Sequence, residues 1–375
     1  MSTWRIPFNR ASLVGGELEN VAAAVAAGHI SGDGMFTRRC EELLERELDA
    51  PRVLLTTSCT HALELAALLL EAGPDDEVVV PSFTFVSSAA AFALRGAKLV
   101  FADVRPDTLN LDETRLDEVI TERTRAIVTV NYAGVACEYD SILAHGIPVV
   151  EDNAHGLFGS YRGRPLGTCG AVAAQSFHET KNFTCGEGGA IVLGDESLVD
   201  RAEIIREKGT DRKRFFRGQV DKYTWVDLGS SYVLTDLLAG FLAAQLEQRG
   251  AIQSARRGLW ERYDVSLRGW ADAVGARRPV VPEGCEQSWH MYYLLLPSFD
   301  VRSALIAWLG ERGILAVFHY LPLHLSAMGR RFGGREGQCP VAEDVSDRLL
   351  RLPFYTSMTE SEQDEVIEAV RAFRT

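Results

Sequence analysis

Short apolar runs alternate with helical patterns between about residues 50 and 200 of the chain. One helical pattern is ALELAALLLEAG (62–73), whose apolar residues recur at helical spacing before a terminal glycine. The apolar runs predict strands at 52–56, 77–82, 98–104, 125–134, 147–155, 173–178 and 189–195. Strands that are apolar on both sides, with helices between them, require a sheet that is covered on both faces. The pattern therefore predicts an α/β core with a mostly parallel, seven-stranded sheet.

The pattern changes after residue 195. A charged helix is expected to run to the stretch REKG (206–209), and an irregular, basic and aromatic segment follows in DRKRFFRGQVDKYTW (211–225). A long helical pattern then spans about Leu234 to Trp270. This pattern leads the chain away from the strand-rich part.

The last hundred residues predict a smaller unit of mixed type. They indicate a strand in YYLLLP, a helix in SALIAWLGERG, a strand in ILAVFHY (314–320) and a final helix from Glu360. We therefore expect two domains, a large α/β domain over residues 1–240 and a smaller C-terminal α+β domain over residues 241–375.

The overall composition indicates the class of protein and the cellular compartment. Hydrophobic residues make up 46% of the 375 residues and charged residues 24%, which is ordinary for a globular chain with a large core. The formal charge of −13 argues against nonspecific binding to nucleic acid or to an anionic membrane. No apolar run of about 18 residues appears, and MSTWRIPFNR lacks the apolar part of a signal peptide. Seven scattered cysteines without a C-x-x-C pair are typical of free thiols, so we expect a cytoplasmic protein.

Three motifs fall where predicted strands of the large domain end, which is where open α/β sheets bind ligands. The first is TTSCTHAL (56–63), in which a strand stops, small hydroxyl residues follow and a helix begins. The free N–H groups and the dipole of a helix start bind phosphate, and Ser58 and Thr60 add hydroxyl donors. Taken alone, the motif is better explained by an ordinary N-cap role for Ser58.

The second motif is VVEDNAH (149–155), where two acids directly follow a buried apolar strand. Adjacent strand residues face opposite ways, so Glu151 and Asp152 have different roles. A buried carboxylate needs a cationic partner, and the ring nitrogen of a cofactor is one such partner. A structural ion pair or a helix cap is the more common explanation of such an acid considered alone.

The third motif is SFHETKNFTCGEGG (176–189), which contains one of only five lysines in the chain. Lys181 lies between a strand that ends near Phe177 and a tight glycine turn. The other four lysines, at positions 98, 208, 213 and 222, begin a strand or lie in charged or polar segments. A partly desolvated lysine has a depressed pKa and forms a Schiff base with a carbonyl group.

Together the three motifs describe one ligand, with a phosphate at one end, a cationic ring nitrogen near a carboxylate and an aldehyde held by lysine. Pyridoxal 5′-phosphate (PLP) has all three groups, and a lysine Schiff base with an aspartate at the pyridinium nitrogen is its recurrent binding pattern. The ring also needs a partner on its open face. PSFTFVSS (81–88) offers Phe83 and Phe85, which strand parity does not separate because both face the same side.

In their order and spacing, these motifs resemble the DegT/DnrJ/EryC1/StrS group of sugar aminotransferases over nearly the whole chain. The resemblance rests on the S-x-T helix start, the P-S-F-T-F run, the E-D dipeptide, and S-F-H-x-x-K followed by G-E-G-G. It implies the aspartate aminotransferase (type I PLP) fold. Within the group, GDGMFTRRC (32–40) and FFRGQVDKYTW (215–225) look closest to the branch that makes dTDP-4-amino-4,6-dideoxygalactose.

The resemblance also implies roles for single residues. Lys181 would hold the cofactor covalently and act as general base and acid, and Asp152 would pair with the pyridinium nitrogen. Phe85 would stack on the ring, and His155 would contact its O3′ side. The phosphate contacts are expected from Ser58, Cys59, Thr60 and Ser176.

One position departs from the pattern of the group. Many relatives place an asparagine of the partner subunit near the phosphate, in a G-x-N-Y context. Here the same stretch reads GSSY, so Ser231 is the candidate for this contact. A homodimer with shared active sites is expected on the same grounds.

The resemblance further implies the reaction and its substrates. L-Glutamate would donate its amino group and leave as 2-oxoglutarate, and C4 of a dTDP-4-keto-6-deoxyhexose would be aminated by the reverse steps. His324 and Tyr320 would lie at the sugar pocket. The basic residues Arg212, Lys213, Arg214 and Arg217 either hold the nucleotide diphosphate or form a solvated surface loop.

Other functions stay open at this stage. They are amination at C3, a PLP-dependent sugar dehydratase, and a non-catalytic PLP-fold binding or regulatory protein. A dehydrating branch of the group has histidine in place of the lysine, so Lys181 favours transamination. A nicotinamide dehydrogenase is disfavoured because no G-x-G-x-x-G follows a first strand. A metal site is not expected, since Cys169, His178 and Cys185 lack zinc-ligand spacing.

Overall fold

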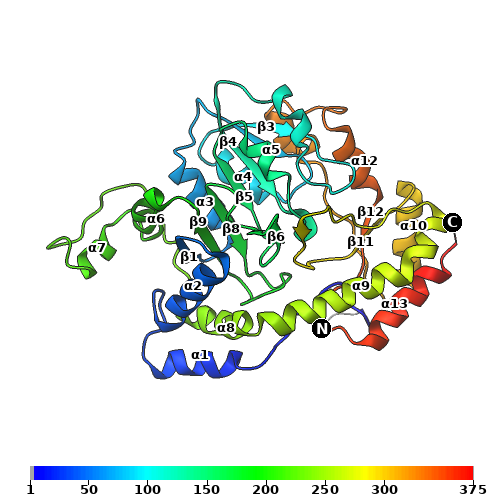
Figure 1. The fold of residues 1–375 in the computed structure, drawn as a ribbon, viewed down its shortest axis with the longest axis horizontal. Helices are drawn as coiled ribbons and strands as arrows, with labels where there is room; N and C mark the ends of the chain where they lie inside the picture. The colour runs from blue at the N-terminus through cyan, green and yellow to red at the C-terminus, as the bar shows by residue number, and fades with distance from the viewer. Residues whose placement is uncertain (1–3, 375) are drawn as a thin grey trace.

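A seven-stranded sheet forms the centre of the protein in a computed structural model that describes residues 4–374 (Figure 1). β9 is antiparallel to both of its neighbours, so the other six strands run in one direction. The sheet order is β1 (Arg52–Thr56), β9 (Gly189–Leu193), β8 (Val172–Ser176), β5 (Val149–Asp152), β4 (Thr124–Val130), β2 (Glu77–Pro81) and β3 (Lys98–Ala102). The predicted seven-stranded, mostly parallel sheet is therefore confirmed.

Helices cover both faces of this sheet because its strands are apolar on both sides. Along β1, Leu54 packs into one core with α3 (Cys59–Leu69) and α4 (Ser87–Ala93). Val53 and Leu55 point the other way, into a second core with α2 (Met35–Leu48) and α8 (Asp236–Glu247). The remaining helices of the large unit are α1 (Glu17–Ala26), α5 (Tyr139–Leu143), α6 (Val199–Arg206) and α7 (Arg212–Phe216).

The C-terminal part has a core of its own. It contains Leu294 of β11 and Leu350 of β12, together with the N-terminal residue Ile6, which forms a bridge with Ile314. Its elements are α9 (Arg249–Val274), β11 (Tyr293–Leu295), α10 (Phe299–Gly310), α11 (Ala327–Arg331), α12 (Pro340–Arg348), β12 (Leu349–Arg351) and α13 (Glu360–Ala372). A small sheet of β6 (Ser160–Tyr161), β7 (Arg164–Pro165) and β10 (Cys285–Glu286) joins the two parts of the chain. The domain division at residue 240 stays a prediction, and α8 spans it.

Two predicted elements differ from those of the structure. The helical pattern from Leu234 to Trp270 is two helices, α8 and α9, because the backbone at Gln248 leaves the helical region with φ −93° and ψ 18°. The strand predicted at 314–320 is wrong, since this segment forms only isolated bridges at Ile314 and Val317. Its neighbour β12 is only three residues long, so there is no extended partner for a full strand.

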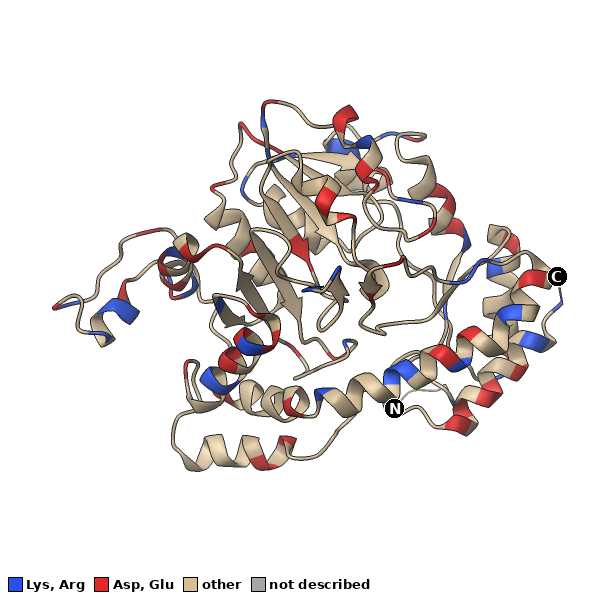
Figure 2. Ribbon diagram, viewed as in Figure 1, with Lys and Arg blue, Asp and Glu red and all other residues tan. Residues whose placement is uncertain are grey.

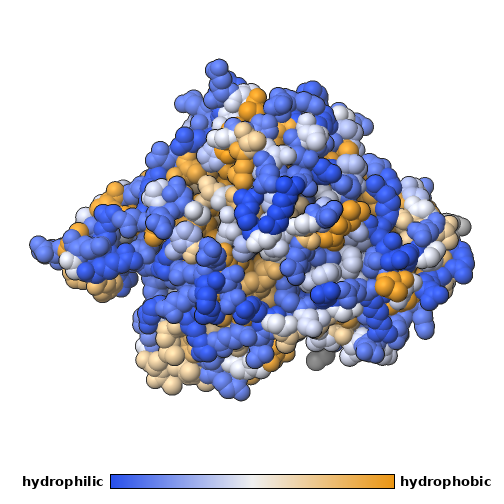
Figure 3. All heavy atoms as spheres, in the orientation of Figure 1, coloured by the Kyte–Doolittle hydropathy of each residue, from blue (hydrophilic) through white to orange (hydrophobic). Residues whose placement is uncertain are grey.

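The surface is mostly hydrophilic. Acidic and basic side chains alternate over the outer helices (Figure 2), and apolar residues gather at a few places, including α1 at the lower left (Figure 3). The segment around α7, defined here as the arm (residues 207–231), extends away from the rest of the protein (Figure 1). Within residues 4–374, no helix is long and apolar enough to cross a membrane.

Candidate active site

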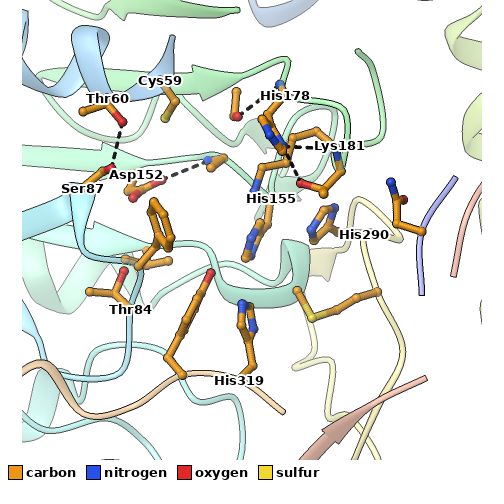
Figure 4. A pocket seen from close by; sticks show the side chains of 18 of the residues that line it. Cys59, Thr60, Thr84, Ser87, Asp152, His155, His178, Lys181, His290 and His319 are labelled. Atoms are coloured by element: carbon orange, nitrogen blue, oxygen red, sulfur yellow. Dashed lines mark hydrogen bonds between the residues drawn. The ribbon is translucent and has the colours of Figure 1, made fainter. Parts of the chain in front are cut away.

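A cavity of about 600 Å³ lies at the carboxyl ends of the parallel strands, and both parts of the chain line it (Figure 4). This volume is within the usual range for cofactor and substrate pockets, and its place is the usual one for open α/β sheets. The predicted residues that line it are Ser58, Cys59, Thr60, Phe85, Asp152, His155, Ser176, Tyr320 and Lys181. Motifs far apart in the sequence thus meet in one site.

The start of α3 forms one end of the cavity. Ser58 has extended backbone and caps the helix, since its Oγ accepts a hydrogen bond from the backbone N–H of His61 at 3.1 Å. Cys59 and Thr60 form the first turn, and the Thr60 hydroxyl lies 2.8 Å from that of Ser87. Ser58 is therefore both an N-cap and a lining residue, and the helix dipole makes this end attractive to an anion.

Gly189 allows the start of α3 to lie against the sheet. It is paired with Thr56 of β1 on one side and Ser176 of β8 on the other. A Cβ at position 189 would lie 2.4 Å from the backbone N of Cys59 and 2.4 Å from the backbone C of Ser58. The last glycine of CGEGG is thus required by a close approach of backbone at the anion-binding end.

The two acids at the end of β5 face opposite ways, as strand parity predicts. Glu151 points away from the cavity and accepts backbone N–H groups of Gly167 and Gly170 at 2.9 and 2.7 Å. Asp152 points into the cavity, where its carboxylate accepts from the Ser88 hydroxyl at 2.6 Å and from the backbone N–H of Ala154 at 3.2 Å. Burial raises the pKa of Asp152, and these hydrogen bonds and the charge of Lys181 oppose that rise.

Lys181 lies in the connection between β8 and β9 and lines the cavity together with Asp152 (Figure 4). Burial lowers the pKa of its amine, although nearby Cys59 and Asp152 oppose that effect. The lysines at 98, 208 and 213 each pair with a glutamate. Lys181 forms no ion pair within the described part of the chain, so it is a largely desolvated amine available for chemistry.

Phe85, rather than Phe83, faces the cavity. Its side chain is 55% exposed, whereas that of Phe83 is 1% exposed and packs edge-on against Tyr132 at a centroid distance of 5.3 Å. Parity did not separate these residues because β2 ends at Pro81, and strand alternation no longer holds beyond it. An exposed ring next to a small-molecule cavity is suited to stacking on a flat ligand.

Three buried histidines form the wall below Lys181. The rings of His155 and His290 stack at 4.2 Å, and His319 lies with its Nδ1 3.0 Å from the Tyr132 hydroxyl. Burial holds the pKa of all three well below the ordinary value, so their rings are neutral. His155 Nδ1 is buried and has no hydrogen-bond partner among the described residues.

These features fit the predicted cofactor. The helix start and the close approach at Gly189 match a phosphate, the Asp152 carboxylate matches a cationic ring nitrogen, and Lys181 matches an aldehyde. His155 has an unsatisfied nitrogen that suits a ligand oxygen. The chemistry of the donor set therefore fits PLP.

His324 does not line this cavity. It is fully buried between Ser82, whose hydroxyl lies 2.6 Å from Nδ1, and Glu343, whose carboxylate lies 2.9 Å from Nε2. Both ring nitrogens are thus occupied by the protein itself. Its neighbour Tyr320 does line the cavity, so only one of these two predicted sugar contacts lies next to Lys181.

The predicted contacts on the arm also lie outside the cavity of their own chain. Arg212 pairs with Glu207 at 3.4 Å and Arg214 with Asp200 at 3.0 Å. Ser231 is exposed and forms a bridge with Glu207. Within one chain these residues therefore do not reach the Lys181 site.

Sequence reasoning missed two lining residues that carry titratable groups, His290 and Arg351. Both come from the C-terminal part, where strands are short and motifs carry little spacing information. A signal was present for Arg351, since RLLRLPFY (348–355) places a charge inside an apolar run. Within residues 4–374, no group of three or more acidic, cysteine or histidine side chains is arranged to hold a metal.

Comparison with known proteins gives matches over nearly the whole chain. The DegT/DnrJ/EryC1/StrS aminotransferase family matches residues 12–371. The spore coat polysaccharide biosynthesis protein SpsC of Bacillus subtilis is 32% identical over 378 residues, which cover 98% of this chain and 96% of that protein. A pleiotropic regulatory protein of Geobacillus stearothermophilus is 32% identical over 320 residues, which cover 84% and 82%.

A solved structure with the same fold is Spr1654 from Streptococcus pneumoniae. Its apo form superimposes with a TM-score of 0.91 at 28% identity, and the match covers 98% of this chain and 97% of that one. The same protein has also been solved in PMP and PLP forms. The similarity thus includes a protein whose structure is known with the cofactor that the cavity fits.

Proposed function

The chain belongs to the DegT/DnrJ/EryC1/StrS aminotransferase family and uses PLP, and from this premise we propose its reaction. The protein transfers the amino group of L-glutamate to C4 of a dTDP-4-keto-6-deoxyhexose, giving a dTDP-4-amino-4,6-dideoxyhexose and 2-oxoglutarate. The observation that carries the proposal is the desolvated, unpaired amine of Lys181 in one cavity with Asp152. The choice of C4 and of dTDP rests on the resemblance of GDGMFTRRC and FFRGQVDKYTW to the branch that makes this product.

The cofactor supplies an aldehyde that reacts with amines and a ring that withdraws electrons. Lys181 would hold the cofactor covalently and, once freed by the donor, would move a proton to and from the donor's α-carbon. Its lowered pKa favours this role, because a larger fraction of the amine is unprotonated at neutral pH than for an exposed lysine. Asp152 stabilises the protonated ring nitrogen, while Ser88 and the N–H of Ala154 fix the direction of its carboxylate.

The start of α3 and Ser176 would bind the phosphate of the cofactor. Phe85 would cover one face of its ring, and His155 would offer its free Nδ1 to a ring oxygen. Tyr320 lies at the sugar side of the cavity. Because the three histidines are neutral, they can orient substrate hydroxyl groups without adding charge.

We also propose a homodimer in which the arm of one protomer enters the site of the other. Three findings support it: Arg212, Arg214 and Ser231 miss the cavity of their own chain, the arm extends from the body, and it carries exposed aromatic rings. Phe216 is 70% and Trp225 74% exposed. Side chains of this size, gathered on one projecting segment, are typical of an interface.

The decisive experiment is an assay of the PLP-loaded protein with L-glutamate and a panel of 3-keto and 4-keto dTDP-sugars. Mass spectrometry and NMR of the product give the position of the new amine. We expect amination at C4 of a 4-keto-6-deoxyhexose. Amination at C3, or loss of a hydroxyl without gain of nitrogen, would replace the proposal by a C3 aminotransferase or a dehydratase. Bound PLP with no turnover of any sugar would indicate the binding or regulatory alternative.

A further inference from the structure

Arg351 is a cation of the cavity without an acidic partner. It is the last residue of β12, where its backbone N–H donates to Val317 O at 2.7 Å and fixes the start of the side chain. The side chain lines the same cavity as Lys181 and Asp152. No carboxylate within the described residues forms an ion pair with it, although burial lowers the pKa of the guanidinium and disfavours its charge.

The donors of Arg351 are mostly unused. Its Nε is buried without a hydrogen-bond partner, and one Nη reaches only Phe318 O, at the long distance of 3.5 Å. Two fully buried arginines elsewhere in the fold have closer partners. Arg206 pairs with Asp33 at 2.8 Å, and Arg256 donates to the backbone oxygens of Trp289 and His290 at 3.0 and 2.5 Å. A half-buried guanidinium with unused donors at the wall of a cavity is suited to bind a ligand with negative charge.

The charge of Arg351 reaches the reacting groups. It contributes to the lowered pKa of Lys181, and also to that of His290 and His319. An anion held by Arg351 therefore lies within electrostatic reach of the amine that moves the proton. Of the two tyrosines whose charge states couple to that of Arg351, Tyr320 lines the cavity, and Tyr132 is fully buried with its ring 6.2 Å from that of Tyr320.

The chemistry of the site selects among the anions that come near it. The phosphate of the cofactor is assigned to the start of α3, which is a different element from β12. A nucleotide diphosphate needs several cations, whereas Arg351 and Lys181 are the only arginine and lysine among the lining residues of this cavity. A carboxylate has the planar shape and single charge that one guanidinium binds through two parallel hydrogen bonds.

We propose that Arg351 binds a carboxylate of the amino donor and of the keto acid that leaves. The proposal rests on the proposed function, because it assigns the donor subsite of the same reaction. Arg351 would hold the donor by its acid group while the donor's amine reaches the cofactor.

Phe8 explains how the same cavity accepts a sugar, which has no carboxylate, in the second half of the reaction. The Arg351 guanidinium carbon lies 4.5 Å from the centre of the Phe8 ring. The face of an aromatic ring is a neutral partner that attracts a cation. The guanidinium therefore keeps one partner when no carboxylate is present. This partner lowers the free-energy cost of an unpaired cation while the cavity holds the sugar instead of the amino acid.

The test uses glutarate, a five-carbon dicarboxylate without an amino group, as a probe that cannot react. Isothermal titration calorimetry on the PLP-loaded protein would compare the wild type with Arg351→Gln, Arg351→Lys and the control Arg277→Gln. Arg277 is exposed and does not line the cavity. We expect Arg351→Gln to weaken glutarate binding about tenfold to a hundredfold, the usual loss for a charged hydrogen-bonded pair. Arg351→Lys should lose less, and Arg277→Gln nothing.

A second measurement separates binding from general damage. In single half-reactions, Arg351→Gln should raise the KM for L-glutamate and leave the KM for the keto sugar and the PLP absorbance unchanged. Equal loss for both substrates, or unaltered glutarate binding, would overturn the proposal. So would loss of dTDP binding with glutarate binding intact, because Arg351 would then serve the nucleotide. Glutarate binding measures the role of Arg351 even if no sugar is aminated. Failure of the proposed function can therefore be distinguished from failure of the Arg351 assignment.

Discussion

At the scale of single residues, the site depends on groups whose charge is disfavoured by burial. Lys181 is the clearest case, since three other lysines have glutamate partners and Lys181 has none among the described residues. Desolvation lowers its pKa, so a larger fraction of this amine is unprotonated than in an exposed lysine.

Lys181→Ala should leave the fold intact but lower turnover by at least about a hundredfold, the usual contribution of a positioned acid–base group. In the wild type, borohydride should fix the cofactor on the peptide that contains Lys181, as mass spectrometry would detect. Lys98→Ala is the control, because Glu77 keeps Arg123 as a partner at 2.7 Å. Labelling of another peptide, or substantial turnover by Lys181→Ala, would contradict the assignment.

The three buried histidines make stability depend on pH. Their pKa values lie well below the ordinary value in the folded state, chiefly because of burial, and return to about 6.5 on unfolding. The unfolded chain therefore binds more protons below pH 6.5. Their contribution to stability is complete above pH 6.5 and is lost progressively as the pH falls below it.

Urea unfolding at pH values from 7 to 5 measures this effect. Removing one group by His290→Gln should reduce the dependence of the unfolding free energy on pH by about 1.4 kcal/mol per pH unit below 6.5, the value for one proton. Glutamine can keep the bond that His290 Nδ1 makes to Asn182 at 2.9 Å. His29→Gln is the matched control for loss of an imidazole at an exposed site. Equal slopes for wild type and His290→Gln would show that this ring is protonated in the folded state.

At the scale of elements, the join between β9 and the start of α3 sets the anion-binding end. Gly189→Ala should push the backbone of Ser58 and Cys59 away from the strand, since a Cβ would lie 2.4 Å from each. We expect about tenfold weaker PLP binding and a loss of stability of about 1–3 kcal/mol, as for other overpacked sites. PLP titration and urea unfolding would measure these changes.

Gly258→Ala is the matched control for Gly189→Ala. Gly258 is exposed within α9, and nothing lies within 4 Å of a Cβ placed there. Alanine is the better helix former, so this variant should gain up to about 1 kcal/mol and bind PLP normally. Wild-type PLP binding by Gly189→Ala would show that the helix start moves without consequence for the phosphate.

The sequence predicts those parts of the fold and the candidate site whose sequence patterns are local. The large-domain strands were predicted within a few residues because each is an apolar run bounded by turn residues, and Lys181 and Asp152 follow from their places at strand ends. The segment 314–320 looked like another such run but has only two bridges, since its partner is too short. Arg351 and the two C-terminal histidines come from such short elements, and only tertiary packing brings them to the cavity.

At the scale of the whole molecule, the arm is the part that a single chain does not explain. Arg212 and Arg214 have exposed side chains that form ion pairs with acids of the same chain. Ion pairs of exposed side chains contribute little to stability, so these arginines can exchange their partners for another anion. Phe216 and Trp225 are mostly exposed on the same segment. In an acidic protein, a basic arm that reaches a neighbouring site would supply the local positive charge that a nucleotide diphosphate requires.

Complementation between two damaged variants tests whether the arm acts in the partner's site. Lys181→Ala lacks the amine, and Arg212→Gln/Arg214→Gln lacks the predicted diphosphate contact, so each homodimer should have little activity. A mixed dimer has one site with Lys181 from one protomer and an intact arm from the other. Random mixing makes half of the dimers mixed, each with one good site of two, so activity should return to about a quarter of the wild type. No gain on mixing, with mixed dimers verified by native mass spectrometry, would place the arm's role within its own chain.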